Sequence, residues 1–168
     1  MASIHWAKAV SGTFGAGGDW SGGRVPGAGD AAILDAAGST AYTVSATANA
    51  TVNSIQLAST ALSDIKADFS VINGTGAGAN VGAIRVENGA TLTLQGPVTN
   101  TGTTEIFGEA SATSIVIGQS GVTLDGGGEV FLNFSGGRFQ QIVGASSTAV
   151  LTDVDNRISG QGCWAAGA

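Results

Sequence analysis

A short β-forming pattern that returns after about thirty residues constrains this chain more than any other feature. The pattern Gly-Ala-Thr-Leu-Thr-Leu at residues 89–94 comes back as Gly-Val-Thr-Leu-Asp-Gly at residues 121–126. Between the two copies, short apolar runs alternate with Gly, Asn, Ser and Thr. Near-repeats of short strands at this period are typical of a solenoid, in which each repeat stacks on its neighbours.

The composition favours tightly turned β-structure over helices. The 168 residues include 28 Gly and only 11% are charged, so the Lys, Glu and Arg that usually cover helices are scarce. Leu94, Leu124 and Leu151 recur at intervals of about thirty residues, as the stacked positions of successive coils would. We therefore predict an all-β fold, a single-stranded parallel β-helix, whose core contains Leu94, Val116, Leu124 and Leu151.

The dipeptide Asn88-Gly89 points to an alternative architecture. It is the strongest short-range signal for a two-residue β-hairpin, so an antiparallel β-sandwich is the alternative fold. A sandwich of this length usually has longer strands with charged outer faces. Here many runs are three to five residues long and carry Thr, Ser and Asn at the outer positions, which favours the parallel β-helix.

The aromatic residues near the N-terminus favour a cap. Residues 1–29 carry Trp6, Phe14 and Trp20 in a Gly-rich setting. A solenoid must cover the open face of its first coil, and bulky aromatic side chains serve this purpose. We predict one domain over residues 1–168, with an N-terminal cap at 1–29 and coils at 30–168. Trp6 and Trp20 are interpreted as cap residues, and a carbohydrate-stacking platform is the second interpretation.

The C-terminal residues predict an uncovered end. Residues 150–158 match a coil strand, and the chain then finishes in Gly, Ala and one Trp, with no charge after Arg157. The last coil of a parallel β-helix exposes unpaired N–H and C=O groups, and the side chain of Trp164 is small cover for such a core. We expect the segment to be a fragment of a longer protein and to associate end to end with itself.

Charge and hydropathy exclude several classes of partner. The net charge is −6 and the sequence has no cluster of Lys or Arg, which argues against nucleic acid and against an anionic membrane. No run approaches the roughly 20 apolar residues that span a bilayer, so we expect no membrane insertion. The single Cys163 excludes an internal disulfide, and residues 1–10 lack the pattern of a signal peptide.

Two groups of motifs resemble repetitive bacterial surface proteins. The first, Asp19-Trp-Ser-Gly-Gly-Arg-Val-Pro-Gly-Ala-Gly-Asp30, resembles the entry segment of autotransporter passenger and adhesin-like proteins. The second is similar to their coil repeats and comprises Glu87-Asn-Gly-Ala-Thr-Leu-Thr-Leu-Gln-Gly96, Thr123-Leu-Asp-Gly-Gly-Gly-Glu-Val130 and Leu151-Thr-Asp-Val-Asp-Asn-Arg-Ile-Ser-Gly-Gln-Gly162. The resemblance implies an extracellular right-handed parallel β-helix at the bacterial cell surface. It would be a stalk or an adhesive surface, with a surface glycan or protein as partner.

Carboxylate pairs point to the alternative function, a carbohydrate-active β-helix enzyme. Polysaccharide lyases and glycoside hydrolases need clustered carboxylates, usually with a Lys or Arg base or a calcium ion. The candidates are Asp64 with Asp68, Asp125 with Glu129, and Asp153 with Asp155, and the nearest basic residues are Lys66 and Arg157. Isolated acids at turns explain these pairs at least as well. We therefore expect a non-enzymatic adhesin-like scaffold with no catalytic residues.

Calcium is the one cofactor that the sequence suggests. The calcium-binding β-helix repeat has the pattern Gly-Gly-x-Gly-x-Asp-x-(apolar)-x, and residues 125–129 have its glycines without its tandem aspartates. The candidate ligands are Asp153, Asp155 and Asn156. We expect no other cofactor.

A regular array of hydroxyl groups is a third functional hypothesis. Some ice-binding solenoids use such arrays, and here Thr91 and Thr93 face outward, with Thr123 and Thr152 stacked beyond them. Threonine on a strand is also simply a good β-former, so we prefer the scaffold interpretation.

Overall fold

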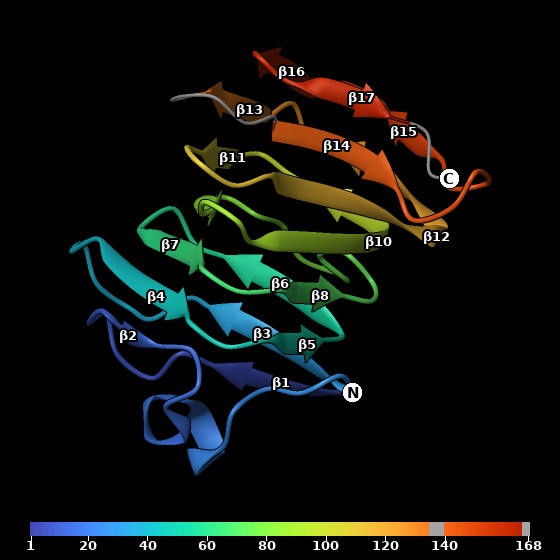
Figure 1. The fold of residues 1–168 in the computed structure, drawn as a ribbon. Coiled ribbons are helices and arrows are strands. Elements are labelled where there is room, and N and C mark those ends of the chain that lie inside the picture. The colour runs from blue at the N-terminus through green and yellow to red at the C-terminus, as the bar shows by residue number, and fades with distance from the viewer. Residues whose placement is uncertain (135–139, 166–168) are drawn as a thin grey trace.

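The computed structural model describes residues 1–134 and 140–165, which form short strands stacked from the N-terminal to the C-terminal end (Figure 1). Segments far apart in the sequence therefore lie side by side. In this described part, helical structure is limited to two 3-10 turns, η1 (Gly17–Asp19) and η2 (Ser21–Gly23). No helix there is long and apolar enough to cross a membrane.

The described strands form three parallel sheets. Sheet 1 contains β1 (Ala2–His5), β3 (Asp30–Leu34) and β6 (Ser54–Leu57). Sheet 2 contains, in spatial order, β2 (Gly12–Thr13), β4 (Tyr42–Ala46), β7 (Ala61–Ile65), β9 (Ala83–Val86), β11 (Thr103–Gly108), β13 (Glu129–Phe134) and β16 (Arg157–Gly160). Sheet 3 contains β5 (Ala50–Val52), β8 (Phe69–Val71), β10 (Thr91–Thr99), β12 (Thr113–Asp125), β14 (Gln140–Gly144) and β17 (Cys163–Ala165), and β15 (Leu151–Asp153) also pairs with β12.

From β3 to β8 the chain passes twice through sheets 1, 2 and 3 in the same order, and from β9 to β14 it alternates between sheets 2 and 3. From β3 it enters sheet 2 at β4 and sheet 3 at β5, and then returns to sheet 1 at β6. We call one such passage a tier. Beyond β6, parallel bridges from Leu57 to Asn80 and from Asn80 to Asn100 continue the line of sheet 1. In later tiers β10 and β12 are long strands whose pairing shifts register between Leu94 and Gly96.

The pairing of the described strands is parallel throughout. The prediction of an all-β fold is confirmed, and the antiparallel alternative is contradicted. The dipeptide Asn88-Gly89 connects β9 in sheet 2 to β10 in sheet 3, and Gly89 has a φ of 83°. Glycine adopts positive φ at little cost, so the dipeptide turns a corner between two sheets and forms no hairpin.

Side chains alternate between the core and the outer surface along the strands. In β10, Leu92 and Leu94 are buried, whereas Thr91 and Thr93 are half-buried on the outer side. Leu124 is buried in β12. This period of two is expected of strands that have one face on a core, and it places Leu94 and Leu124 where the sequence predicted.

Two predicted core positions need correction. Val116 is half-buried and pairs with the outward Thr93, because Ile115 and Ile117 take the inward positions of β12. This run is apolar on both faces, so the pattern alone does not show which face is inward. Leu151 is only partly buried against the core.

The predicted column of leucines is not formed. Leu94 pairs with Ile117, whereas Leu124 and Leu151 lie beyond the register shift and face other partners. Side chains that are hydrogen-bonded between neighbouring tiers are 19 residues apart for Ser45 and Asp64 and 20 apart for Asn80 and Asn100. Between β12 and β14 the separation is 27 residues. The first pairs, Ala2–Asp30 and Gly12–Val44, are 28 and 32 residues apart, and the last, Gln141–Cys163, is 22 apart. The length of a tier therefore varies along the chain, and an interval of about thirty residues is not general.

An aromatic cluster covers the N-terminal end. Trp6, Phe14 and Trp20 are buried and pack edge to face, with ring centroids 5.0 Å apart for Trp6–Trp20 and 5.1 Å for Phe14–Trp20. Phe14 also packs on Phe69 of β8 at 5.2 Å, which joins the cluster to the core. Trp6 and Trp20 are each 2% exposed, so neither offers a ring face on which a sugar could stack. Their burial agrees with a cap and contradicts the platform.

The cap is shorter than the predicted residues 1–29. β1 pairs with β3 and β2 pairs with β4, so the first residues already belong to the sheets. The covering residues are Trp6, between β1 and β2, and Phe14 and Trp20 in the loop between β2 and β3, which carries η1 and η2. Sequence patterns missed β1 and β2 because these strands have only four and two residues, too few for a period of two to be recognised.

β16 and β17 lie at the opposite end of the stack (Figure 1). β16 pairs with β13, and β17 pairs with β14, so sheets 2 and 3 continue to this end. The side chain of Trp164 lies outside the described part of the chain. Its role as a cover stays a prediction.

Candidate functional site

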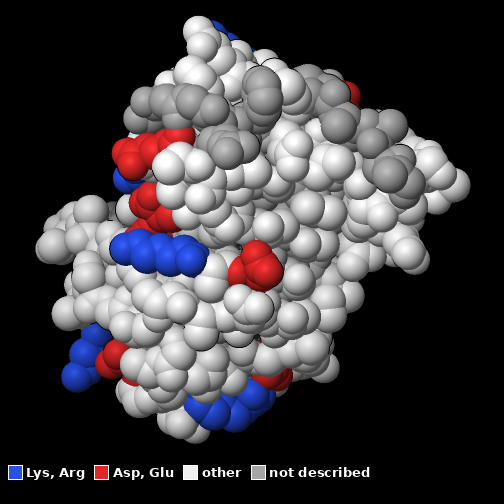
Figure 2. Space-filling model, in the orientation of Figure 1, with Lys and Arg blue, Asp and Glu red and all other residues white. Residues whose placement is uncertain are grey.

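Charged side chains gather on the outer face of sheet 2. Figure 2 shows red and blue groups along one side of the molecule, over the region where β7, β11 and β13 lie in Figure 1. The parallel register pairs Asp64 of β7 with Arg85 of β9, and Arg85 with Glu105 of β11. Lys66 and Glu87 follow two residues after Asp64 and Arg85. We call Asp64, Lys66, Arg85, Glu87 and Glu105 the charged cluster.

Asp64 is the buried centre of the charged cluster, with a residue exposure of 7%. Its Oδ2 accepts a hydrogen bond from the Ser45 hydroxyl at 3.1 Å and lies 3.0 Å from the Lys66 ammonium. Among the described residues, its Oδ1 is buried and has no conventional hydrogen-bond donor. Burying a carboxylate oxygen without a donor costs free energy of folding. In this respect Asp64 differs from the acid of an ordinary ion pair that is exposed to water.

Arg85 connects the acids of neighbouring strands. Its Nε lies 3.2 Å from Glu87 Oε1 and 3.6 Å from Glu105 Oε2. Its guanidinium carbon stands 4.3 Å from the centroid of the Phe107 ring, a distance typical of a cation–π contact. The guanidinium is thus held between two carboxylates and an aromatic face.

The surroundings of Glu87 favour its neutral form. Burial raises the pKa of Glu87 most, and the charge of Asp64 and a hydrogen bond with Asp64 raise it further, against the opposing charges of Arg85 and Lys66. The hydrogen bond and charge of Asp64 also raise the pKa of Lys66, which stays an ammonium. The charged cluster therefore combines a protonatable carboxyl, a buried carboxyl and two cations.

Polar groups farther along the same face are tied to each other. Glu105 accepts a hydrogen bond from Asn133 at 2.6 Å, and Glu129 accepts one from the Ser159 hydroxyl at 2.8 Å. Arg157 Nε lies 3.9 Å from Glu129. These contacts run from tier to tier, so the outer face of sheet 2 carries a continuous set of cross-strand side-chain pairs.

The partners of Asp64 in the charged cluster differ from the carboxylate pair that the sequence suggested for it. Asp68 is exposed at the corner before β8 and does not belong to the cluster, whereas Arg85 and Glu87 come from the next tier. Sequence reasoning missed these partners because it compared residues close in the chain. The signal that could have found them is the recurrence of Asp64, Arg85 and Glu105 at intervals of about twenty residues.

The calcium candidates take part in an internal ladder of asparagines. Asn80 donates to Asn100 Oδ1 at 2.7 Å, and Asn100 donates to Asn156 Oδ1 at 2.9 Å. All three residues are buried, and Asn100 is 0% exposed. We call Asn80, Asn100 and Asn156 the asparagine ladder. Its hydrogen bonds pair both side-chain amide groups of Asn100 inside the stack, so the Asn156 side chain that accepts one of them has a structural role.

Asp153 and Asp155 are engaged by backbone amides. Asp153 Oδ1 accepts from the Asn156 amide at 3.1 Å, and Asp155 Oδ1 accepts from the Gly127 amide at 2.9 Å. Within residues 1–134 and 140–165, no three His, Cys, Asp or Glu side chains are grouped as metal ligands would be. Calcium binding by Asp153, Asp155 and Asn156 stays a prediction.

The proposed threonine array is interrupted. Thr123 and Thr152 are paired in neighbouring strands, but Thr91 pairs with Ser114 and Thr93 pairs with Val116. The apolar Val116 breaks the line of hydroxyl groups. Because an ordered hydroxyl lattice needs the same residue in successive tiers, this surface does not favour the third hypothesis.

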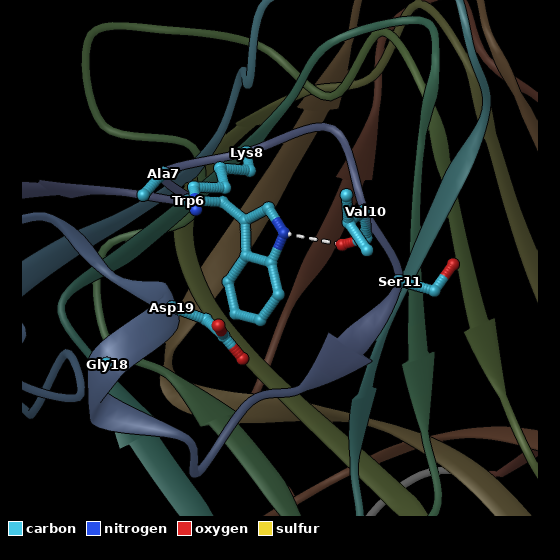
Figure 3. A pocket seen from close by; sticks show the side chains of 7 residues that line it. All are labelled: Trp6, Ala7, Lys8, Val10, Ser11, Gly18 and Asp19. Carbon is cyan, nitrogen blue, oxygen red and sulfur yellow. Dashed lines mark hydrogen bonds between the residues drawn. The ribbon is translucent and has the colours of Figure 1, made fainter.

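A pocket of about 310 Å³ lies beside the N-terminal cap (Figure 3). Its lining includes the indole of Trp6, the carboxylate of Asp19 and the side chains of Lys8 and Ser11. The indole N–H donates to the Val10 carbonyl at 3.0 Å, and the Ser11 hydroxyl accepts from the Thr43 amide at 2.9 Å. Both groups are thus engaged within the protein.

Comparisons with protein-family models, with curated proteins and with solved structures find no match. Function is therefore inferred from the residues of this chain and their contacts.

Proposed function

We propose that the chain is a segment of a right-handed single-stranded parallel β-helix that acts as a rigid scaffold. The observation that carries the proposal is the repeated order, sheet 1, sheet 2 and sheet 3, from β3 to β8, followed by regular alternation between sheets 2 and 3 with parallel bridges at Asn80 and Asn100. In a β-helix each tier bonds to the tiers before and after it, and the stack gains stiffness from these continuous ladders. Parallel crossover connections are right-handed in nearly all known proteins, which supports the assigned hand.

The scaffold would belong to a secreted or surface-displayed bacterial protein of the adhesin or autotransporter-passenger type. Support comes from the adhesin-like motifs at residues 19–30, 87–96, 123–130 and 151–162, of which the first falls in the cap loop and the others at the successively paired strands β10, β12 and β15. The paired side chains along sheet 2 also suit a self-contained rod better than an open binding cleft. A surface glycan or protein would be its partner.

Distances between spin labels on one face test the scaffold. Thr43, Leu62, Ala83, Thr103, Glu129 and Arg157 are successive partners in sheet 2. At about 4.8 Å per strand, a rigid stack separates the backbones of Thr43 and Arg157 by roughly 24 Å, and those of Thr43 and Glu129 by roughly 19 Å.

The labels are placed at Thr43→Cys with Arg157→Cys, and at Thr43→Cys with Glu129→Cys, in a Cys163→Ser background. Two narrow distance distributions that differ by about one strand spacing support the scaffold. Broad distributions, or equal mean distances for the two pairs, would refute a rigid parallel stack.

A carbohydrate-active enzyme is the second candidate function, and the charged cluster is the observation that favours it. A protonatable Glu87 beside Asp64, with Lys66 at 3.0 Å from that carboxylate, has the group types that general acid and base catalysis of glycan cleavage requires. The engagement of Asp64 by Ser45 and Lys66 opposes this role, because a catalytic carboxylate must be free to reach the substrate.

We expect no cleavage of acidic or neutral polysaccharides by the chain, with or without added calcium. New reducing ends or unsaturated products are measured against a heat-inactivated sample. Products that form with the native chain and disappear in Glu87→Gln would establish the enzyme and overturn the scaffold-only proposal.

A further inference from the structure

The junction between the tiers of β7 and β9 carries two carboxyl groups on the same outer face. Asp64 pairs with Arg85 in the register, so Glu87 is its diagonal neighbour, at a spacing that long side chains can span. Among the described residues, Asp64 Oδ1 is buried and has no hydrogen-bond donor. The Asp64 side chain is 10% exposed and that of Glu87 is 24% exposed, so water reaches this junction poorly. The backbone amide of Glu87 donates to the Ile65 carbonyl at 2.8 Å, which fixes the two tiers against each other at this position.

Two carboxyl groups placed so close in a poorly hydrated site favour holding one proton between them. If both are ionised, like charges face each other in a poorly hydrated site. If one is protonated, its O–H donates to the carboxylate of the other, and hydrogen bonds to charged acceptors are the strong ones. Asp64 is the better acceptor because the Lys66 ammonium and the Ser45 hydroxyl already hold its Oδ2.

We propose that the Glu87 carboxyl donates its proton to Asp64 Oδ1 and thereby forms a pH-sensitive joint between neighbouring tiers. Loss of this proton leaves two ionised carboxylates close together and loosens the junction between β7 and β9. The joint goes beyond the scaffold function, because it predicts that one specific level of the stack responds to pH.

The charges around the joint agree with one bound proton. The groups that face it are Asp64 and Lys66 from the β7 tier, Arg85 and Glu87 from the β9 tier, and Glu105 from β11. Three carboxyls meet two cations, so protonation of one carboxyl makes the charged cluster neutral. Arg85 is shared between Glu87 and Glu105, so it offsets the charge of Glu87 only in part.

The sign of the pH effect follows from this arrangement. The pKa of Glu87 is raised above its ordinary value of 4.5, so the folded chain holds the proton more tightly than the unfolded chain. The stabilising contribution of the proton is complete below pH 4.5 and is lost as the pH rises through the pKa of folded Glu87.

Carbon-13 NMR of the glutamate side chains tests the joint directly. We expect the Glu87 carboxyl to titrate above 4.5 in the native chain, and its midpoint to move back toward 4.5 in Asp64→Asn. An ordinary midpoint in the native chain would overturn the proposal, as would a raised midpoint that Asp64→Asn leaves unchanged.

A second measurement does not depend on the folding of Asp64→Asn. Glu87→Gln places an N–H donor where the proton is and removes the titration. We expect the native chain to lose melting temperature as the pH rises through the Glu87 midpoint, and Glu87→Gln not to show this loss.

Glu109→Gln is the matched control, because it makes the same change at an exposed glutamate outside the charged cluster. It should keep the loss of melting temperature. The same pH dependence in the native chain and in Glu87→Gln would overturn the joint and leave the scaffold proposal untouched.

Discussion

At the scale of single residues, the alternation of inward and outward side chains decides how much each contributes. Leu94 is buried and pairs with Val71 and Ile117, whereas its neighbour Thr93 faces outward. We expect Leu94→Ala to lower the free energy of unfolding by about 2–4 kcal/mol, through lost transfer energy and a cavity. Thr93→Ala should change it by less than about 0.5 kcal/mol. Urea denaturation measures both, and equal losses would contradict the assigned register.

Asn100 is the central residue of the asparagine ladder. Asn100→Ala would leave the amide of Asn80 and the side-chain carbonyl of Asn156 without their partners inside the stack. We expect a loss of about 2–4 kcal/mol in the free energy of unfolding, since each buried unpaired group costs about 1–3 kcal/mol. Asn49→Ala is the control, because Asn49 is exposed and accepts one backbone hydrogen bond. A small loss for Asn100→Ala, equal to that of the control, would show that the ladder contributes little.

Asp30 predicts a pH effect opposite in sign to that of Glu87. Arg24 Nη1 and Nη2 lie 2.6 and 2.9 Å from the two Asp30 oxygens, and the Gly27 amide donates at 3.0 Å. These hydrogen bonds, those of Arg24 above all, hold the pKa of Asp30 well below its usual range. A lowered pKa contributes stability that is complete above the unfolded value, near 3.8, and is lost as the pH falls below it.

Melting temperatures between about pH 5 and pH 2 test this contribution, because Asp30 titrates only in the unfolded chain over most of that range. We expect Asp30→Asn to be less stable than the native chain at pH 5 and to lose less stability on acidification. Asp68→Asn, a change at an exposed acid, should follow the native profile. Parallel profiles for the native chain and Asp30→Asn would contradict the assigned pairing.

At the scale of elements, glycines set how closely one corner approaches the next tier. The turn between β12 and β13 contains Gly126 and Gly127, both with positive φ, and then Gly128. A Cβ on Gly128 would lie 2.5 Å from the carbonyl oxygens of Asn100 and Gly102. Because Gly128 has no side chain, the Asn100 side chain has room to pass this turn and donate its hydrogen bond to Asn156.

Gly128→Ala should therefore disturb both the corner and the asparagine ladder. We expect a loss of about 1–3 kcal/mol in the free energy of unfolding, as for other overpacked sites. Gly29→Ala is the control, because a Cβ at Gly29 meets no atom within 4 Å. Calorimetry of the two variants compares them. A neutral Gly128→Ala would mean that the corner has room to move.

At the scale of the whole molecule, the ends of the stack differ. The N-terminal end is covered by Trp6, Phe14 and Trp20, whereas β16 and β17 are the last described strands of sheets 2 and 3 at the other end. Edge strands with free N–H and C=O groups favour pairing with another chain. The net charge of −6 opposes association, and salt screens this repulsion.

We expect the chain to self-associate end to end, and more strongly as its concentration and the salt concentration rise. Sedimentation velocity over a concentration series, at low and at physiological salt, measures this. A single monomer boundary under all these conditions would show that the end is covered.

Several features of the fold and very little of the charged cluster could be predicted. Short Thr-rich runs and scarce charges indicated an all-β fold, because only turns and ladders suit that composition. The burial of Leu94 and Leu124 followed from alternation with Thr. The outward position of Val116 did not, because a run that is apolar on both faces leaves its orientation to the register with the neighbouring strands.

Patterns of adjacent residues were enough to predict the β-strands, the inward residues of the alternating runs and the aromatic N-terminal cap. The pairs that meet across tiers, such as Asp64 with Arg85 and Asn100 with Asn156, could be identified only from the folded chain. These pairs depend on the length of each tier. That length is set by the corners, and it changes from 19 residues at β4 and β7 to 27 at β12 and β14.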